Sequence, residues 1–343
     1  MPESPDGSDL EPLTPEDALQ LYVQSRRSEL AEQTLQSHRY RITRFLEWCE
    51  TAGIDDMNDV GGRDIQQFKI WRSEQVNTTT LKSNLDTLRV WIRFCEGVQA
   101  VRDGVSESIN SPSLNGSKTT QDIVTESTAS EILAHLSKYE YATVEHAVFR
   151  LLWETGCRAG TLRGIDLDTD VHLTDEYLEA KHRPETGTPL KNQAKGERAI
   201  AISTRTCNIL RDYIAQHRYD RTDKHGQREP LITTRHGRIT VNTIRCYAYR
   251  TTRPCMYGRE CPHNRDPEEC EAVQSRMTAS KCPDSSGTHA LRRGAITHYL
   301  ESDIPADIVS DRLDVQKRTL SEVYDYRSER DKMELRREYF DDL

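Results

Sequence analysis

A polar stretch in the middle of the chain divides it into two parts that are expected to fold separately. Between Val105 and Thr125 the sequence consists mainly of Ser, Asn, Gly, Thr and Gln, with almost no apolar residue. Such a composition cannot bury enough surface to order a segment. A length of 343 residues agrees with two domains of roughly 150 residues each. The expected divisions are a disordered N-terminus (1–11), a first domain (12–103), a linker (104–124) and a second domain (125–343).

Helical signals fill the first of these domains. Thr14, followed by Pro15 and two acidic residues, is typical of a helix N-terminus. Apolar residues then recur at helical spacing over 34–49, 65–71 and 81–95, and Gly53 is placed to end the second helix. The first domain is therefore predicted to be a small bundle of four helices.

The second domain mixes helical patterns with short β-prone stretches. Strands are expected around Val171–Ala180 and Arg198–Ile202, and helices at 206–217, 241–250, 288–300 and 303–313. A Cys- and His-rich insertion spans 254–283. The predicted fold class is mainly α with a small antiparallel β-sheet, in which a helical N-terminal domain precedes an α+β domain.

Composition restricts where such a chain can work. No apolar run approaches the ~18 residues needed to span a bilayer, and residues 1–11 lack the features of a secretory signal. We therefore expect a cytoplasmic protein with reduced cysteines and no membrane partner. The net charge of −9 reflects solubility and does not exclude basic patches for nucleic acid. An acid-rich surface of this kind also suits a halophilic source, a hypothesis that predicts stability rising with KCl up to molar levels.

Side chains suited to phosphodiester chemistry recur along the second domain. Two guanidinium groups can bind the two non-bridging oxygens of a phosphate better than point charges can, and Arg158 and Arg292 are the candidates. His289 lies three residues before Arg292, so both can address one phosphate from the same helical face. A phenol such as Tyr324 can serve as a nucleophile that forms a covalent link. Each motif alone is also compatible with an ordinary solvated or packed surface.

The order and local sequence of these motifs resemble the tyrosine recombinases of the phage integrase family, over roughly residues 14–335. Thr155-Gly156-Cys157-Arg158 is similar to the family's first box, and His289-Ala290-Leu291-Arg292 to its second. The resemblance implies that Tyr324 attacks the phosphate, that Arg158 and Arg292 stabilise it, and that His289 assists proton movement. It also implies a 3′-phosphotyrosyl intermediate and no cofactor for catalysis.

The resemblance further implies a lysine in a strand-turn-strand element that protonates the departing 5′ oxygen. Lys191 and Lys195 are both candidates, and Lys191 is preferred because it precedes the loop into the strand at 198–202. Tyr326 is the near rival of Tyr324. Two positions depart from the family: Thr161 replaces an acid, and Val315 replaces the usual His or Trp nine residues before Tyr324.

The insertion at 254–283 has a different chemistry. Cys255, Cys261, His263 and Cys270 fall within sixteen residues, and thiolates with an imidazole at short spacing suit tetrahedral Zn²⁺. The sequence therefore predicts one structural zinc ion per chain, with Cys282 left open as a further ligand. Free thiols and a loop histidine are the alternative.

Basic residues outside the motifs are candidates for contacts with DNA phosphates. They are Arg39, Arg41 and Arg44 in the first domain, and Arg245 and Arg250 in the second. The family resemblance implies double-stranded DNA as the partner, a homotetramer on two DNA sites and accessory DNA-bending proteins. The alternatives are a type IB topoisomerase and a DNA-binding regulator without catalysis.

Overall fold

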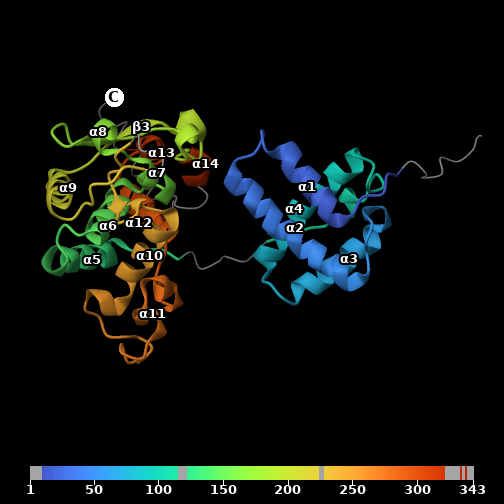
Figure 1. The fold of residues 1–343 in the computed structure, drawn as a ribbon. Coiled ribbons are helices and arrows are strands. Elements are labelled where there is room, and N and C mark those ends of the chain that lie inside the picture. Colours follow the sequence, from blue (N-terminus) through green and yellow to red (C-terminus); the bar gives the residue numbers. More distant parts are fainter. Residues whose placement is uncertain (1–9, 115–121, 224–227, 321–332, 334–336, 338–343) are drawn as a thin grey trace, which may run out of the picture. The chain divides into compact units, whose positions relative to one another are not determined.

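The computed structural model describes residues 10–114, 122–223 and 228–320, together with positions 333 and 337 (Figure 1). The chain separates into two compact units, with the division between Thr119 and Thr120. Each unit has its own buried hydrophobic cluster.

The first unit is built from four α-helices, as the periodicity predicted. They are α1 (Pro15–Arg26), α2 (Glu32–Ala52), α3 (Gly62–Ser73) and α4 (Thr78–Gly97). The Thr14 side chain caps α1 by accepting a hydrogen bond from the backbone N–H of Asp17, and Gly53 ends α2 in the left-handed conformation. Both ends were signalled by residues whose local hydrogen bonding or backbone freedom favours a helix terminus.

An aromatic core holds the four helices together. Phe45 of α2 meets Phe68 of α3 and Trp91 of α4 edge-on, with ring centroids 5.1 and 5.8 Å apart. All three side chains are almost completely buried, and edge-to-face pairs of this kind add to the stabilisation from apolar burial. This core fixes α2, which also carries Arg39, Arg41 and Arg44.

The first unit extends into the segment that we expected to be linker. The short 3-10 helix η2 (Ser106–Ser108) and Ile109 pack onto it, and Ile109 is 1% exposed. The guanidinium of Arg89 donates to the carbonyl oxygen of Ile109. Two apolar residues, Val105 and Ile109, and hydrogen bonds from the Arg89 side chain to the backbone therefore order a stretch whose composition alone predicted otherwise.

The second unit is mainly helical. Its helices are α5 (Glu126–Tyr139), α6 (Val144–Thr155), α7 (Ala159–Gly164), α8 (Leu167–Asp170), α9 (Thr204–Gln216), α10 (Val241–Thr252), α11 (Glu271–Gln274), α12 (Thr288–Glu301), α13 (Ala306–Leu313) and α14 (Lys317–Thr319). The hydrophobic cluster of this unit includes residues of α5, α6, α9, α10 and α12.

Two small antiparallel sheets accompany these helices. One has the order β1 (Val171–His172), β2 (Tyr177–Ala180), β3 (Arg198–Ala201), and the other pairs β4 (Thr233–Thr234) with β5 (Gly237–Arg238). The single strand expected over 171–180 is instead a tight hairpin, because the chain turns at 173–176 with Glu176 at φ 58°. The mainly α fold with small antiparallel sheets is confirmed.

A buried ion-pair network anchors the long connection from β2 to β3. Arg183 binds Asp170 and Asp166, with the closest N–O distance at 2.6 Å. Burial opposes ionisation of Asp170, but the hydrogen bonds from Arg183 outweigh it and hold the pKa of this carboxyl below its ordinary value. Arg183 therefore holds the start of the connection at 181–197, which carries both candidate lysines, against Asp166 and Asp170.

Candidate active site

Arg158 lies at a sharp turn between two helices. Gly156 ends α6 in the left-handed region, at φ 56°, and Arg158 is the N-terminal cap residue of α7. A Cβ atom at Gly156 would overlap the side chain of Leu313 at the end of α13. Glycine is therefore needed here both for the backbone conformation and for the close approach of α13. The turn places the Arg158 side chain, which is 22% exposed, with its guanidinium beside the residue that follows α13.

Arg292, on α12, is buried directly behind this turn. Its side chain is 5% exposed and donates hydrogen bonds to the carbonyl oxygens of Gly156, at 2.8 Å, and Leu313, at 2.7 Å. Charged donors to buried carbonyls form the stronger class of protein hydrogen bonds. Arg292 therefore holds α12 to the turn before Arg158 and to the end of α13 at the same time.

Asp314 joins these arginines to the β2–β3 connection. It caps α13 at φ 51°, and one carboxylate oxygen accepts from Arg158 Nη1 at 2.7 Å. The other oxygen accepts from Asn192 Nδ2 at 2.6 Å. The carboxylate thus links Arg158 with the residue next to Lys191 across more than a hundred positions of sequence. Sequence reasoning missed Asp314, although it directly precedes the unusual Val315.

Val315 itself contributes no polar group to the site. Its side chain packs against the small cluster of Ile296, Leu300, Val309, Leu313 and Leu320. An ionised Asp314 is an acceptor only, so it orients the surrounding cations and does not replace the hydrogen-bond donor that the resemblance implies at position 315. Thr161, the other departure, is buried in α7.

Both candidate lysines are exposed on the β2–β3 connection. Lys195 belongs to the 3-10 turn η4 (Gln193–Gly196). Lys191 is close enough to His289 for its charge to lower the pKa of that imidazole. Lys191 is thus one of the cations whose field acts on the second motif, and the choice between Lys191 and Lys195 stays a prediction.

His289 begins α12 among several cations. Desolvation by the surrounding protein lowers the pKa of its imidazole, and the charges of Arg245, Arg293, Arg292 and Lys191 lower it further. Since the ordinary pKa of histidine is about 6.5, the ring is uncharged at neutral pH and able to accept a proton. The same cations make this surface attractive to an anion.

Replacing Arg245 with Gln is expected to raise the pKa of His289 toward its ordinary value. The imidazolium loses a repelling neighbour, so protonation becomes easier, while desolvation keeps part of the depression. An NMR titration of the histidine ring signals in the free protein measures this directly, with the His289→Gln spectrum for assignment. Arg211→Gln, on α9, is the control and should leave the His289 titration unchanged; equal shifts in both variants would contradict the assignment.

Tyr324 and its rival Tyr326 lie outside the described residues. The described chain reaches Leu320, whose side chain is buried in the cluster with α12 and α13. The structure thus brings together Arg158, Lys191, His289 and Arg292, and the nucleophile stays a prediction.

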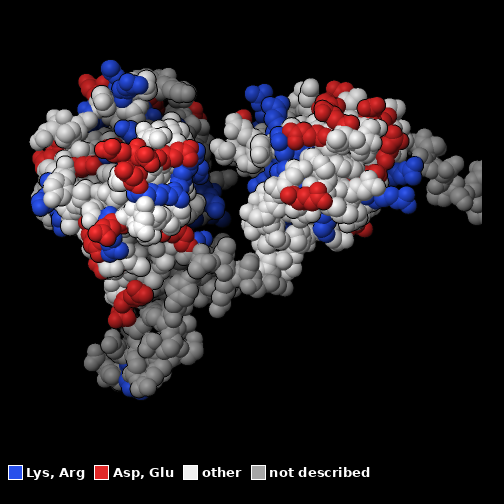
Figure 2. Space-filling view, turned by 90° about the horizontal axis from the view of Figure 1, so that it is seen from below, with Lys and Arg blue, Asp and Glu red and all other residues white. Residues whose placement is uncertain are grey.

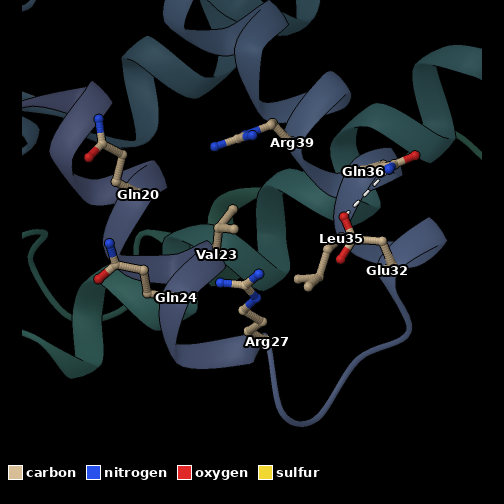
Figure 3. A pocket seen from close by; sticks show the side chains of 8 residues that line it. All are labelled: Gln20, Val23, Gln24, Arg27, Glu32, Leu35, Gln36 and Arg39. Carbon is tan, nitrogen blue, oxygen red and sulfur yellow. Dashed lines mark hydrogen bonds between the residues drawn. The ribbon is translucent and has the colours of Figure 1, made fainter. Parts of the chain in front are cut away.

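The candidate DNA-binding arginines of the first unit differ in their surroundings. Arg39 is exposed and lines a pocket of about 320 Å³ between α1 and α2, together with Arg27 and glutamine side chains (Figure 3). Arg41 donates to the Thr87 hydroxyl at 3.0 Å. Arg44 pairs with Glu47 at 2.7 Å and lies over the ring of Tyr40. Of the three, Arg39 is presented best for a phosphate.

In the second unit Arg245 and Arg250 have different surroundings. Arg245 is exposed on α10 near His289. Arg250, one turn further along the same helix, forms ion pairs with Glu140 at 3.2 Å and Glu145 at 3.0 Å. In this structure the guanidinium of Arg250 thus ties α10 to α6 and to the end of α5, and its predicted DNA contact stays a prediction.

Acidic and basic side chains are not mixed evenly over the surface. On the face shown in Figure 2, Asp and Glu gather in patches of their own beside Lys and Arg. A net charge of −9 is thus compatible with local basic surfaces.

Among the residues that the structure describes, no helix combines the length and the apolar character needed to cross a bilayer.

The predicted zinc ligands share one location. Cys255, Cys261, His263 and Cys270 line a single small pocket, and Cys282 lines it as well. The His263 ring is hydrogen-bonded to the Asp284 carboxylate. Within the described ranges, no three His, Cys, Asp or Glu side chains are arranged to hold a metal ion as they stand.

A family model matches the first unit, and curated relatives match larger parts of the chain. Residues 18–96 match the family model described as phage integrase, N-terminal SAM-like domain. Tyrosine recombinase XerD of Bifidobacterium longum is 22% identical over 190 residues, which cover 54% of this chain and 58% of that protein. XerD of Mycobacterium tuberculosis is 22% identical over 309 residues, covering 86% and 87%.

Solved structures share the fold over most of the chain. A lambda integrase dimer bound to a COC′ core site is 15% identical, with a TM-score of 0.63 over 92% of this chain and 77% of that one. The Tn1549 transposon integrase in complex with a circular intermediate DNA is 14% identical, with a TM-score of 0.65 over 92% and 98%. The first unit therefore contains a domain of the phage integrase N-terminal type, and the chain is similar to tyrosine recombinases in sequence and shares the fold of integrases over most of its length.

Proposed function

We propose that this chain is a site-specific DNA recombinase that cuts and rejoins duplex DNA through a 3′-phosphotyrosyl intermediate. One observation carries the proposal: Asp314 and Arg292 bring Arg158, the Lys191 loop and the start of α12 to one place. The names of the relatives, which are recombinases and integrases, support the same reaction class.

In the proposed first step the Tyr324 phenol oxygen attacks a backbone phosphorus, and the bond from phosphorus to the 5′ oxygen breaks. His289 accepts the phenol proton, and Lys191 donates a proton to the departing 5′ oxygen. Arg158 and Arg292 bind the non-bridging oxygens, where charge develops. Attack by a 5′ hydroxyl of another strand reverses these steps and rejoins the DNA.

This chemistry needs no cofactor, because the phosphotyrosyl bond retains the energy of the broken phosphodiester. Asp314 acts as a positioning residue. Its carboxylate orients Arg158 and Asn192 in the free protein, and an incoming phosphate would compete with it for Arg158. Binding of the DNA phosphate would therefore weaken the ion pair between Arg158 and Asp314.

The partner in this proposal is double-stranded DNA, held by both units. Arg39 in the first unit and Arg245 in the second are the proposed phosphate contacts. Two structures that share the fold are a lambda integrase dimer bound to a COC′ core site and a lambda integrase tetramer bound to a Holliday junction. By analogy we propose that four copies of this chain act on two DNA sites.

A covalent trapping assay tests the reaction class. Nicked duplexes from the DNA that flanks the gene should give a protein–DNA adduct that resists denaturation. Tyr324→Phe should abolish this adduct, because no phenol oxygen remains to attack, while Tyr326→Phe should retain it. Loss with Tyr326→Phe alone would move the nucleophile by two residues. Specific binding without any adduct would favour a non-catalytic DNA-binding regulator.

The leaving-group proton can be assigned in the same assay. Lys191→Ala should lose adduct formation on ordinary DNA and regain it when sulfur replaces the bridging 5′ oxygen, because a thiolate leaves without a proton. Lys195→Ala is the matched control from the same connection and should behave like the unmodified protein on both substrates. Rescue of Lys195→Ala instead would reverse the two roles.

A further inference from the structure

The insertion between α10 and α12 has too small an apolar core to order itself. Figure 1 shows it projecting from the rest of the second unit around α11. Its regular structure is limited to the one-turn α11 and the 3-10 helices η5 (Pro254–Tyr257) and η6 (Arg276–Lys281). The buried apolar residues within it are Ala272 and Ala279. Segments that lack a core in this way are commonly held by metal ions or disulfides.

Four thiols from separate parts of the insertion line one pocket. Cys255 follows α10, Cys261 and Cys270 flank the loop before α11, and Cys282 directly follows η6. The pocket has a volume of about 20 Å³, which is room for about one water-sized particle. Four thiol groups around a space of this size match the number of ligands in a structural zinc site.

A buried cation beside the pocket supplies an independent observation. Arg253 lines the pocket, is 4% exposed, and donates through Nη1 to the carbonyl oxygen of Ala272. Its buried Nε has no hydrogen-bond partner among the described residues. An unpaired buried donor on a charged group is costly. Four thiolates on Zn²⁺ carry a net charge of −2, so they would supply both the missing acceptor and the counter-charge.

We propose that Cys255, Cys261, Cys270 and Cys282 bind one structural Zn²⁺ ion. This set replaces His263 of the sequence prediction with Cys282. The reason is charge: four thiolates give the net −2 that faces the buried Arg253, whereas three thiolates and an imidazole give −1. The hydrogen bond of His263 Nε2 to Asp284 does not decide between the sets, because Nδ1 is not involved in it. Binding draws the thiols together and displaces their protons.

The ion would tie the end of α10 to the approach to α12. Cys255 lies three residues after α10, and Cys282 six before α12. Between them the Thr252 hydroxyl donates to the carbonyl of Ser286 at 3.0 Å and accepts from its N–H at 2.7 Å. Since α10 carries Arg245 and α12 carries His289 and Arg292, the zinc would stabilise the relative position of the two helices that present these groups.

Metal analysis of the purified chain, without DNA, tests this proposal apart from any recombinase activity. We expect about one zinc per chain, a loss of most of it in Cys282→Ser, and full retention in His263→Gln. Cys246→Ala is the matched control, since this buried thiol of α10 contacts Met277 and does not line the pocket. A zinc-free wild-type protein, or full zinc in Cys282→Ser, would overturn the proposal.

X-ray absorption on the wild-type chain gives an answer even if the cysteine variants fail to fold. Four sulfur ligands at about 2.3 Å are expected. Three sulfurs with one nitrogen would restore the set that contains His263 and refute the proposed one.

Discussion

Gly294→Ala is expected to destabilise the second unit by about 3 kcal/mol, a large effect for a single methyl group. Gly294 lies in α12, where a Cβ atom would overlap the backbone carbonyl oxygen of Val124 and come within 2.8 Å of the Trp153 ring. The carbonyl belongs to the chain that enters α5, so it cannot rotate away as a side chain would. Helix α12 must shift instead, and it carries His289 and Arg292.

Chemical denaturation with urea measures this change. Gly160→Ala is the matched control, because a Cβ atom at this helical glycine of α7 meets nothing within 4 Å. It should be neutral or stabilising by up to about 1 kcal/mol through helix propensity. Equal unfolding free energies for the two variants would show that α12 does not pack on Val124 as closely as described.

A shift of α12 also predicts a functional consequence. Covalent adduct formation by Gly294→Ala should fall even at temperatures where the variant is folded, since the two side chains of the second motif move relative to Arg158. Circular dichroism under the assay conditions distinguishes the loss of activity from unfolding, because it shows whether the variant is folded when adduct formation is measured.

Local signals in the sequence predicted much of this molecule. Thr14 caps a helix and Gly53 ends one through interactions with residues only a few positions away. The i, i+3 spacing of His289 and Arg292 also follows from a single helix. Such features can be predicted from a short stretch of sequence, because the interactions that produce them join residues that are close together in the chain.

Long-range pairs were beyond what the sequence predicted. The sequence around Arg250 does not indicate that its guanidinium will pair with Glu140 and Glu145, since these acids lie more than a hundred residues earlier in the chain. Asp314 becomes part of the site only because α13 ends beside Arg158 and Asn192. The turn inside 171–180 was missed because β-prone residues surround it. Val105 and Ile109 were assigned to a linker because two apolar residues hardly change the composition of a long polar stretch.

Arg292→Lys is expected to lower covalent adduct formation by at least about 100-fold and to destabilise the second unit by about 2 to 4 kcal/mol. Lysine keeps the charge but has one ammonium in place of a planar fork. It cannot satisfy the carbonyl oxygens of Gly156 and Leu313 together and also bind a phosphate oxygen. One buried carbonyl then loses its partner, and the turn that presents Arg158 loosens.

The neighbouring Arg293→Lys isolates this effect from the general loss of a guanidinium. Arg293 is half-buried on the same helix and also contributes to the field at His289, yet no carbonyl bridge across the site depends on it among the contacts described. We expect its unfolding free energy to change by less than about 0.5 kcal/mol and its adduct yield to stay within a few-fold of the wild type.

Adduct formation by Arg292→Lys should therefore be compared with that of Arg293→Lys below both unfolding midpoints and at saturating DNA. Under these conditions neither unfolding nor weak binding can explain a difference. A remaining defect in Arg292→Lys then reports the loss of the bridge that positions Arg158 against the phosphate. Wild-type cleavage by Arg292→Lys would mean that the bridge is structural only and that Arg158 alone binds the reacting phosphate.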